Sequence, residues 1–363
     1  MRLIKKLFVS ACVAVVATLA LPITKALAEE PLQVGFLHEN PVGQGGWTLS
    51  HELARKKVDE YFQGRVVTTA IDGIAPGVDA ERILTKYARD GKDLIFATSF
   101  GYLNPVKKVA QRYRKTTFEH ASGYLQAANV GTFQIRAYQG RYLSGILAGK
   151  TTKADVIGYV GSFPIPEVLR GINAFTLGVQ SVNPNAKVEL IWTNSWSDPA
   201  KEKEATELLI AKGADVITHH TESASVIKAA AQAGVYGIGY QSDRAAAGGE
   251  YHLASVVHNW FPIYKEIIEE KLAGTWQSKN RWVGVEKDAS QLVSLNSNIP
   301  QATLDLIDQA RAAMISGEVN VFRGPITDQA SVVQIAAGES ADDAYLLSMQ
   351  WLVKGVNGQL DAN

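Results

Sequence analysis

The stretch ARDGKDLIF (residues 88–96) has a counterpart in IAKGADVIT (residues 210–218). Each reads as the end of a helix, a glycine that terminates it, and an aspartate that opens an apolar strand. In each case this strand lies 60 positions after an earlier one, which contains Val34 in the first half and Val156 in the second. Joints of this kind occur in any α/β protein, but the equal spacing favours an internal duplication and two equivalent lobes.

Strand-like and helix-like segments alternate on both sides of these stretches. In the first half, strand-like segments occupy residues 32–39, 65–72, 93–99 and 116–120. Helix-like segments lie between them at residues 48–62, 78–89 and 104–113. Strand-like segments resume at residues 155–162, 187–194, 215–220 and 235–240. The alternation predicts an α/β protein with helices on parallel sheets, and the chain length favours two lobes over one core.

The first 28 residues have the composition of a secretory signal peptide. A short basic start precedes an apolar run at residues 7–23, and a small-residue pattern ends at Ala28. Pro22 and Lys25 interrupt the run before it reaches the roughly 20 apolar residues that a membrane span needs. We therefore expect export to the periplasm with cleavage after Ala28.

Cys12 offers an alternative, because VSAC (residues 9–12) looks like a lipoprotein box that would anchor the chain. The apolar stretch continues beyond Cys12, whereas such a box normally closes it, so cleavage after Ala28 is the preferred interpretation. Cys12 is also the only cysteine. A chain that starts at Glu29 therefore has no disulfide, no thiolate nucleophile and no cysteine metal ligand.

Composition and motifs argue against several classes of function. Without residues 1–28 the chain has 32 basic and 36 acidic residues, so we expect no nucleic-acid or anionic-membrane partner. The sequence contains no G-x-S-x-G motif, and His51-Glu52 lacks the second histidine of H-E-x-x-H. His219 and His220 should point to opposite faces of a strand, one into a cleft and one into the core. We expect no enzyme, no cofactor and no metal site.

The loops after the predicted strands carry aromatic and carboxylate side chains. A glycine-rich turn at residues 40–46 leads into Trp47, but it matches neither a dinucleotide motif nor a P-loop. Phe100, Trp196 and Glu222 follow other strands. Rings that stack and carboxylates that accept hydrogen bonds suit a flat heterocycle with N–H groups. A sugar site could use the same residues, and each ring could instead pack in the core.

Several short motifs occur in a fixed order between residues 32 and 330. They are VGF (34–36) with GGW (45–47), YLSGILAG (142–149), GYVG (158–161), GINAF (171–175), SDP (197–199), GADV (213–216) and GYQSD (239–243). Together they resemble the basic membrane protein family, the PnrA-like substrate-binding proteins of ABC importers. The resemblance implies a type I periplasmic-binding-protein fold, with two doubly wound α/β lobes joined by hinge crossovers, and a purine base or nucleoside as ligand.

The resemblance also assigns roles to particular residues. Trp47 stands at the position of the family's first stacking aromatic, and Asp243 matches the aspartate that holds the edge of the base. His258 stands where family members often carry a lysine, and the first loop is not rich in Asp and Asn. These departures, with the additional tryptophans, favour a compact free base such as adenine over a nucleoside.

We therefore expect an ABC-importer binding protein that closes its lobes on a purine. The expected ligand-binding residues are Trp47, Phe100, Tyr240 and Trp196 for stacking, and Asp243, Glu222 and Asn40 for the polar edge. The expected lobes are residues 29–148 plus about 259–290, and residues 149–258 plus about 291–363. The expected partner is an ABC permease, and the expected state is a monomer. A ligand sensor for a membrane receptor, or a carrier of a different small ligand, remains the alternative.

Overall fold

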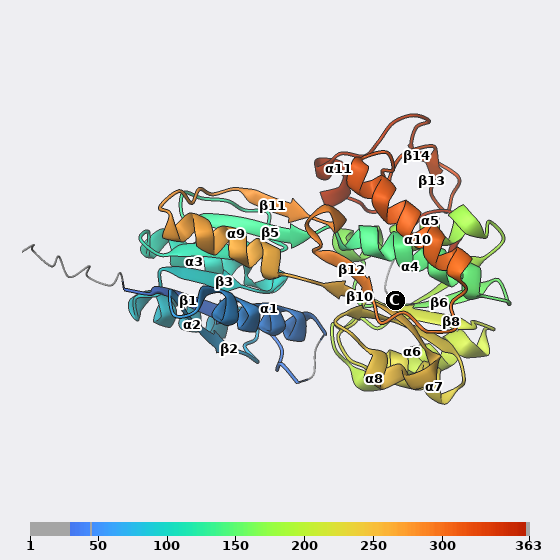
Figure 1. Cartoon of the computed structure of the whole chain (residues 1–363), viewed down its shortest axis with the longest axis horizontal. Coiled ribbons are helices and arrows are strands. Elements are labelled where there is room, and N and C mark those ends of the chain that lie inside the picture. Colours follow the sequence, from blue (N-terminus) through green and yellow to red (C-terminus); the bar gives the residue numbers. More distant parts are fainter. Residues whose placement is uncertain (1–29, 44–45, 361–363) are drawn as a thin grey trace, which may run out of the picture. The chain divides into compact units, whose positions relative to one another are not determined.

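The computed structural model describes residues 30–43 and 46–360 (Figure 1). The predicted signal peptide and Cys12 lie outside the described residues. Within the described part of the chain, no helix combines the length and apolar character required to cross a membrane.

The observed elements follow the alternation that the sequence predicts. The strands are β1 (Leu32–Leu37), β2 (Val66–Ile71), β3 (Leu94–Ala97), β4 (Thr117–Ala121), β5 (Val130–Ile135), β6 (Val156–Gly161), β7 (Lys187–Trp192), β8 (Val216–His219), β9 (Tyr236–Gln241), β10 (His252–His258), β11 (Asn280–Val283), β12 (Ser290–Val293), β13 (Ile326–Thr327), β14 (Val333–Ile335) and β15 (Val356–Asn357). The α-helices are α1 (Gly46–Phe62), α2 (Val78–Arg89), α3 (Leu103–Arg112), α4 (Ala137–Thr151), α5 (Pro166–Val182), α6 (Pro199–Ala211), α7 (Ser225–Gln232), α8 (Ala245–Gly248), α9 (Phe261–Leu272), α10 (Gln301–Ser316) and α11 (Asp343–Leu347).

The strands form two large sheets with the same central order. The first is β11-β5-β4-β3-β1-β2, and the second is β12-β10-β9-β8-β6-β7-β15. The strand order 2-1-3-4-5 therefore occurs twice, as β1–β5 and as β6–β10. All neighbours are parallel except β12, which runs antiparallel to β10. The prediction of two doubly wound α/β lobes is confirmed.

The register explains the equal spacing of the two fold-determining stretches. Leu94 pairs with Val34 across β3 and β1, and Val216 pairs with Ile157 across β8 and β6. The second pairing is shifted by one residue from the predicted equivalence with Val156. In both lobes the repeated segment of helix end, glycine and strand leads into the third strand, which pairs with the first strand of that lobe.

The chain passes between the two sheets after β5, after β10 and between β11 and β12. The expected first segment ends at residue 148. In the structure, α4 packs on α5 and contacts β10, so the first passage lies at Arg136. The second passage lies at residues 259–260 and the third at residues 284–289.

Helices α4 and α5 of the second lobe approach each other through two glycines. A Cβ atom on Gly145 of α4 would lie 2.1 Å from the carbonyl oxygen of Phe175, and one on Gly178 of α5 would lie 2.1 Å from that of Tyr142. Backbone atoms cannot move aside as a flexible side chain can. The contact therefore requires glycine on both helices.

We predict that Gly145→Ala lowers the free energy of unfolding by about 1–3 kcal/mol, because the added methyl group overpacks the contact. The direction is informative, since Gly→Ala inside a helix otherwise stabilises by about 0.5–1 kcal/mol. Denaturant unfolding of the variant would measure the change. Gly43→Ala is the control, because a Cβ there meets no atom within 4 Å. A stabilised Gly145→Ala protein would contradict the close approach.

Candidate ligand-binding site

A small cavity lies where loops of the two lobes meet. It is lined by Glu39, Trp47, Ser99, Phe100 and Ser122 of the first lobe and by Glu167, Trp196, His220, Glu222 and Gln241 of the second. Most of these residues lie at or shortly after the carboxyl ends of parallel strands, where open α/β sheets bind ligands. The expected residues Trp47, Phe100, Trp196 and Glu222 are among them. The cavity holds about 40 Å³, so the lobes must separate or side chains must shift to admit a ring.

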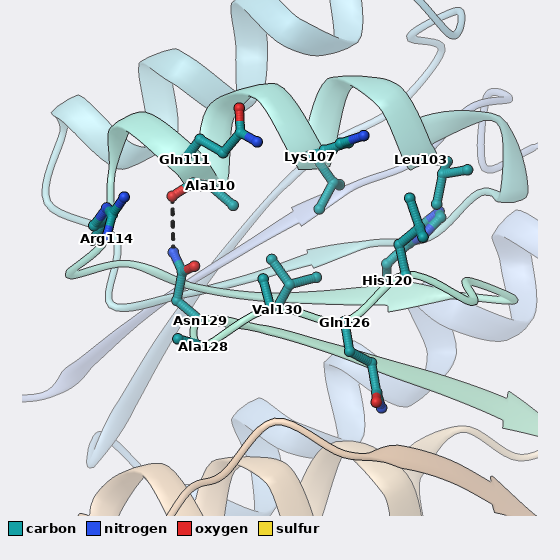
Figure 2. A pocket seen from close by; sticks show the side chains of 13 residues that line it. Leu103, Lys107, Ala110, Gln111, Arg114, His120, Gln126, Ala128, Asn129 and Val130 are labelled. Atoms are coloured by element: carbon teal, nitrogen blue, oxygen red, sulfur yellow. Dashed lines mark hydrogen bonds between the residues drawn. The ribbon is translucent and has the colours of Figure 1, made fainter.

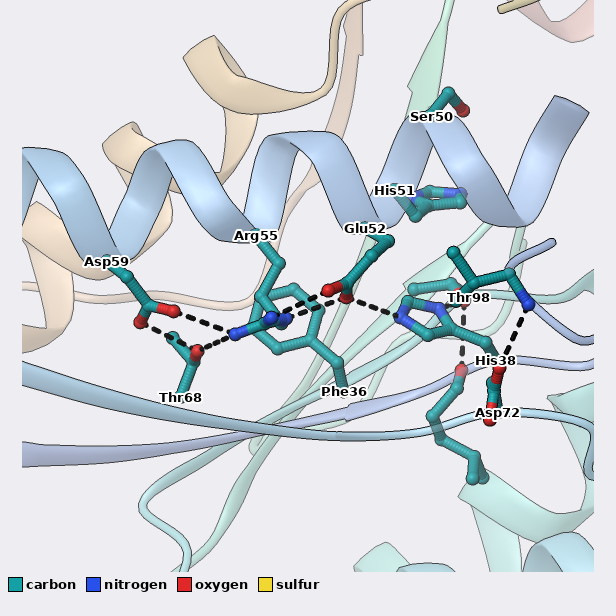
Figure 3. Close-up of polar contacts among 12 residues, drawn as sticks. Phe36, His38, Ser50, His51, Glu52, Arg55, Asp59, Thr68, Asp72 and Thr98 are labelled. Atoms are coloured by element: carbon teal, nitrogen blue, oxygen red, sulfur yellow. Dashed lines mark hydrogen bonds and ion pairs between the residues drawn. The ribbon is translucent and has the colours of Figure 1, made fainter.

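A hydrogen bond holds the ring of Trp47 in the cavity wall. Its indole Nε1 donates to the carbonyl oxygen of Thr98 at 2.7 Å. The hydroxyl of Thr98 donates to the carbonyl of Leu37 at 2.9 Å and lies 2.8 Å from Nδ1 of His38. Since a hydroxyl has one proton, Nδ1 of His38 is the donor in that contact (Figure 3). Trp47 therefore does more than pack on its own helix.

A chain of polar side chains along α1 ends beside His38 (Figure 3). Nε2 of His38 lies 3.8 Å from Oε2 of Glu52. Glu52 accepts two hydrogen bonds from Arg55, at 2.6 and 2.7 Å, and Arg55 also pairs with Asp59 at 2.7 Å. This chain runs from Asp59 to the neighbourhood of His38, whose Nδ1 contacts the hydroxyl of the residue that accepts the Trp47 N–H.

Aromatic rings approach the cavity from both lobes. Trp47 makes edge contacts with Trp260 and His258, with ring centroids 5.1 and 5.8 Å apart. On the other side, Trp196 packs against Phe163 with centroids 5.1 Å apart. Phe100 is 45% exposed at the rim. A planar ligand between Trp47 and Trp196 would contact one ring from each lobe.

Glu222 joins the two lobes through both its backbone and its side chain. Its carbonyl oxygen accepts a hydrogen bond from the backbone N–H of Gly46 at 2.9 Å, and its Oε1 accepts one from Nδ2 of Asn40 at 2.8 Å. The side chain is buried, and Oε2 has no partner among the described residues. Burial raises the pKa of Glu222 to about 7, and the neighbouring Glu39 adds to the shift, whereas the Asn40 bond opposes it.

Two further carboxyl groups lie in the same cavity. Glu39 accepts a hydrogen bond from the hydroxyl of Ser99, and Glu167 interacts with the hydroxyl of Ser122 across the lobes. Burial raises the pKa of both glutamates. The cavity wall therefore combines three acids with aromatic rings, and no lysine or arginine is among the lining residues of the described chain.

His220 and Gln241 complete the polar part of the wall. His220 lines the cavity while its neighbour His219 bonds to Thr221 and lies in the core, as predicted for adjacent strand residues. Burial lowers the pKa of His220 well below its usual value, so the ring is neutral near pH 7. Oε1 of Gln241 has no partner among the described residues. The positive φ of Gln241, 68°, turns it at the end of β9.

The remaining predicted site residues lie outside the lining. Asn40 reaches it only through Glu222. Tyr240 is 1% exposed and lies behind His220, with ring centroids 4.5 Å apart. The carboxylate of Asp243 accepts hydrogen bonds from the hydroxyl of Ser294 at 2.5 Å and from the backbone N–H of residue 245 at 2.9 Å. Asp243 is thus engaged within the second lobe.

Glu39, Ser122 and Glu167 were not among the expected site residues. The predicted first strand ran to residue 39 and so included Glu39, whereas β1 ends at Leu37 and leaves Glu39 in the loop that follows. Ser122 follows β4, and its positive φ of 55° is not visible in the residue pattern. Glu167 lies in the first turn of α5, next to the proline that begins the helix. Glu167 and Glu222 both belong to the second lobe, and the arrangement of the two lobes brings Glu39 of the first lobe to the same cavity.

A second cavity, of about 390 Å³, lies within the first lobe between α3 and residues 125–130 (Figure 2). Its wall is largely apolar, with Lys107 and Arg114 at its rim. Asn129 uses its side-chain amide to donate to the carbonyls of residues 110, 113 and 116. Because one lobe supplies every wall, a hinge motion would leave this cavity unchanged, so it is not the candidate ligand site.

Residues 32–322 match the model of the PnrA-like family of ABC transporter substrate-binding proteins. The chain belongs to this family. It is 43% identical over 335 residues to a purine-binding protein of Brucella abortus, a match that covers 92% of this chain and 95% of the relative. A Haloferax volcanii protein named as a candidate glucose-binding protein of an ABC transporter is 35% identical over 332 residues, covering 91% and 82%.

Solved structures agree with the fold expected of a PnrA-like protein. A solute-binding protein of an ABC transporter from Conexibacter woesei superposes with a TM-score of 0.68 at 22% identity, covering 80% of this chain and 98% of that one. The periplasmic-binding-protein fold that the motifs predicted is therefore confirmed.

The raised pKa of Glu222 predicts a pH-dependent stability difference from Glu222→Gln. The folded pKa of about 7 exceeds the ordinary 4.5, so ionisation costs the folded state stability as pH rises from about 5 to about 7.5. Glu222→Gln removes this cost and should gain up to about 3 kcal/mol relative to the parent over that range. Thermal or denaturant unfolding at several pH values measures the difference. If the unfolding free energies of the parent and the variant changed in parallel with pH, ionisation of Glu222 would not destabilise the folded state.

Proposed function

We propose that this PnrA-like protein is the periplasmic carrier of an ABC importer and that it captures a purine base, adenine or a close analogue, between its lobes. The observation that carries the proposal is one cavity, formed by both lobes, that combines tryptophans from each lobe with buried hydrogen-bond acceptors. The 43% identity to a purine-binding protein supports the same ligand class. The match to a family of ABC transporter substrate-binding proteins supports a role as a carrier.

Trp47 and Trp196 stack on the two faces of the base, and Phe100 closes the rim. The hydrogen bond to Thr98 already fixes the indole of Trp47, so the side chain loses little conformational entropy when a ligand binds. This favours affinity. Glu222 accepts hydrogen bonds from N–H groups on the edge of the base through its unpartnered Oε2.

Lobe closure couples binding to transport. With the lobes apart, the hydrogen bonds of Glu222 to Gly46 and Asn40 are broken, and the purine can enter the cavity. With the lobes together, the ligand is hidden from water and both lobes present a joint surface to the permease. A monomer is sufficient for this cycle, and export through the predicted leader places it in the periplasm.

Two other ligands have specific support. A nucleoside is the alternative that the family resemblance implies. A sugar is the alternative that the name of the Haloferax relative raises. A ligand sensor for a membrane receptor would use the same cavity.

We predict that purine bases, but not sugars, stabilise the purified protein in a thermal-shift screen. A ligand at 100 times its Kd adds about 2.7 kcal/mol to the free energy of unfolding. Trp47→Ala should weaken binding by about 10–100-fold, because stacking contributes about 1–3 kcal/mol per base. Tyr124→Ala, at an exposed tyrosine outside the lining, is the control. Stabilisation by glucose and not by purines would contradict the purine assignment and indicate a sugar ligand.

A pair of variants decides which carboxylate holds the base. The family resemblance selects Asp243, whereas the geometry selects Glu222. We predict that Glu222→Ala weakens purine binding by at least about tenfold, the loss expected when a charged hydrogen-bond partner is removed. Asp243→Ala should change affinity less than Glu222→Ala in the same calorimetric titrations. A larger loss of affinity for Asp243→Ala would show that Asp243, the residue that the family resemblance implies, binds the edge of the base.

A further inference from the structure

The polar groups of the cavity are unbalanced in favour of acceptors. Glu39, Glu167 and Glu222 line it from three different elements, the exits of β1 and β8 and the start of α5. A carboxylate accepts hydrogen bonds at about four lone-pair sites and, when ionised, donates none. The unpartnered Oε1 of Gln241 adds another acceptor.

Half of the side chains that bring an N–H or O–H donor to the wall already use it within the protein. The N–H of Trp47 donates to the Thr98 carbonyl, and the hydroxyl of Ser99 donates to Glu39. The hydroxyl of Ser122 interacts with Glu167. The remaining side-chain donors of the lining are Trp196 Nε1, the Gln241 amide and one nitrogen of neutral His220.

Buried arginines lie behind the wall and balance the acids without entering the cavity. Arg244 donates to the backbone carbonyl of Glu222, and Arg170 donates to the carbonyl of residue 346 at 2.7 Å. Arg141 donates to Thr218 at 3.0 Å, and its guanidinium carbon lies 3.4 Å from the centroid of the Tyr240 ring. These contacts direct the cationic groups to backbone and rings, so a ligand meets the carboxyl side of the arrangement.

We propose that the site selects amino-substituted purines, whose exocyclic amines supply additional N–H donors, and rejects oxopurines with fewer donors and purines with a negative charge. This rests on the proposed purine-binding function and assigns its specificity to Glu39, Glu167 and Glu222. Hypoxanthine, an oxopurine without an exocyclic amine, places a carbonyl oxygen where the wall offers another oxygen and has no amine to compensate. An anionic purine such as urate is repelled by the three acids.

Binding of such a ligand is linked to proton release. The groups that face Glu222 are Asn40 and Glu39 from the first lobe and Glu202 and Arg244 from the second. Burial among them keeps part of the Glu222 population protonated near neutral pH. Ligand N–H donors stabilise the ionised form, so they displace that proton as they bind.

The test compares purines that differ by one amino group in calorimetric titrations of the mature protein. Guanine should bind at least about tenfold more tightly than hypoxanthine, and 2,6-diaminopurine at least as tightly as adenine, because each amine adds a hydrogen bond to a charged acceptor. Urate should not bind. Titrations in two buffers of different ionisation enthalpy should show net proton release near pH 7.

Glu222→Gln supplies a second, independent readout, because it replaces an acceptor with an amide that can also donate. The variant should bind hypoxanthine more tightly relative to guanine than the parent does and should release fewer protons. Glu60→Gln, at an exposed residue outside the lining, is the matched control.

Three outcomes separate the two proposals. Tighter binding of amino-substituted purines with proton release supports the inference. Equal or tighter binding of hypoxanthine or urate overturns it while purine binding stands. Failure of every purine to bind overturns the proposed function and this inference together. The purine comparison uses the unmodified protein, so a variant that fails to fold does not affect it.

Discussion

Glu222 bonds across the cleft through both its backbone and its side chain. The carbonyl oxygen accepts from the first N–H of α1, and the carboxyl group accepts from Asn40. A buried carboxyl group that has lost water needs such partners, because an unpaired buried polar group is costly. Its other carboxyl oxygen has no partner among the described residues. A residue that bonds across the lobes therefore also has unused capacity to accept a hydrogen bond from a ligand.

The duplicated strand order explains why the cavity forms at this place. In each sheet the first strand lies between the second and the third, so the following connections depart in opposite directions and leave a crevice at the carboxyl ends. Glu39 and Phe100 border the crevice of the first sheet, and Glu167 and Glu222 border that of the second. Placing the two crevices against each other encloses a single site with walls from both lobes.

Around this site, burial keeps the histidines neutral. His220 and His258 have lowered pKa values, about 3 in the case of His258, because burial disfavours the charged ring and the Arg141 charge adds to the effect. Neutral rings can pack against Trp47 and Tyr240 as flat apolar groups. The acids and the arginines therefore carry the charge of this region, and the aromatic wall between them remains uncharged.

Much of this protein was determined by the sequence alone. The spacing of apolar runs and the helix-ending glycines predicted the two α/β lobes, because secondary structure follows from local patterns. The ordered motifs indicated the family through their resemblance to it. The same reasoning found Trp47, Phe100, Trp196 and Glu222, since strand exits are visible in sequence. Only the tertiary structure decided that Glu167 joins Glu39 and Glu222, that Asp243 is engaged with Ser294, and that Tyr240 lies behind the wall. Which side chains face the same cavity depends on how two lobes meet, and contacts between residues so distant in sequence leave no local pattern.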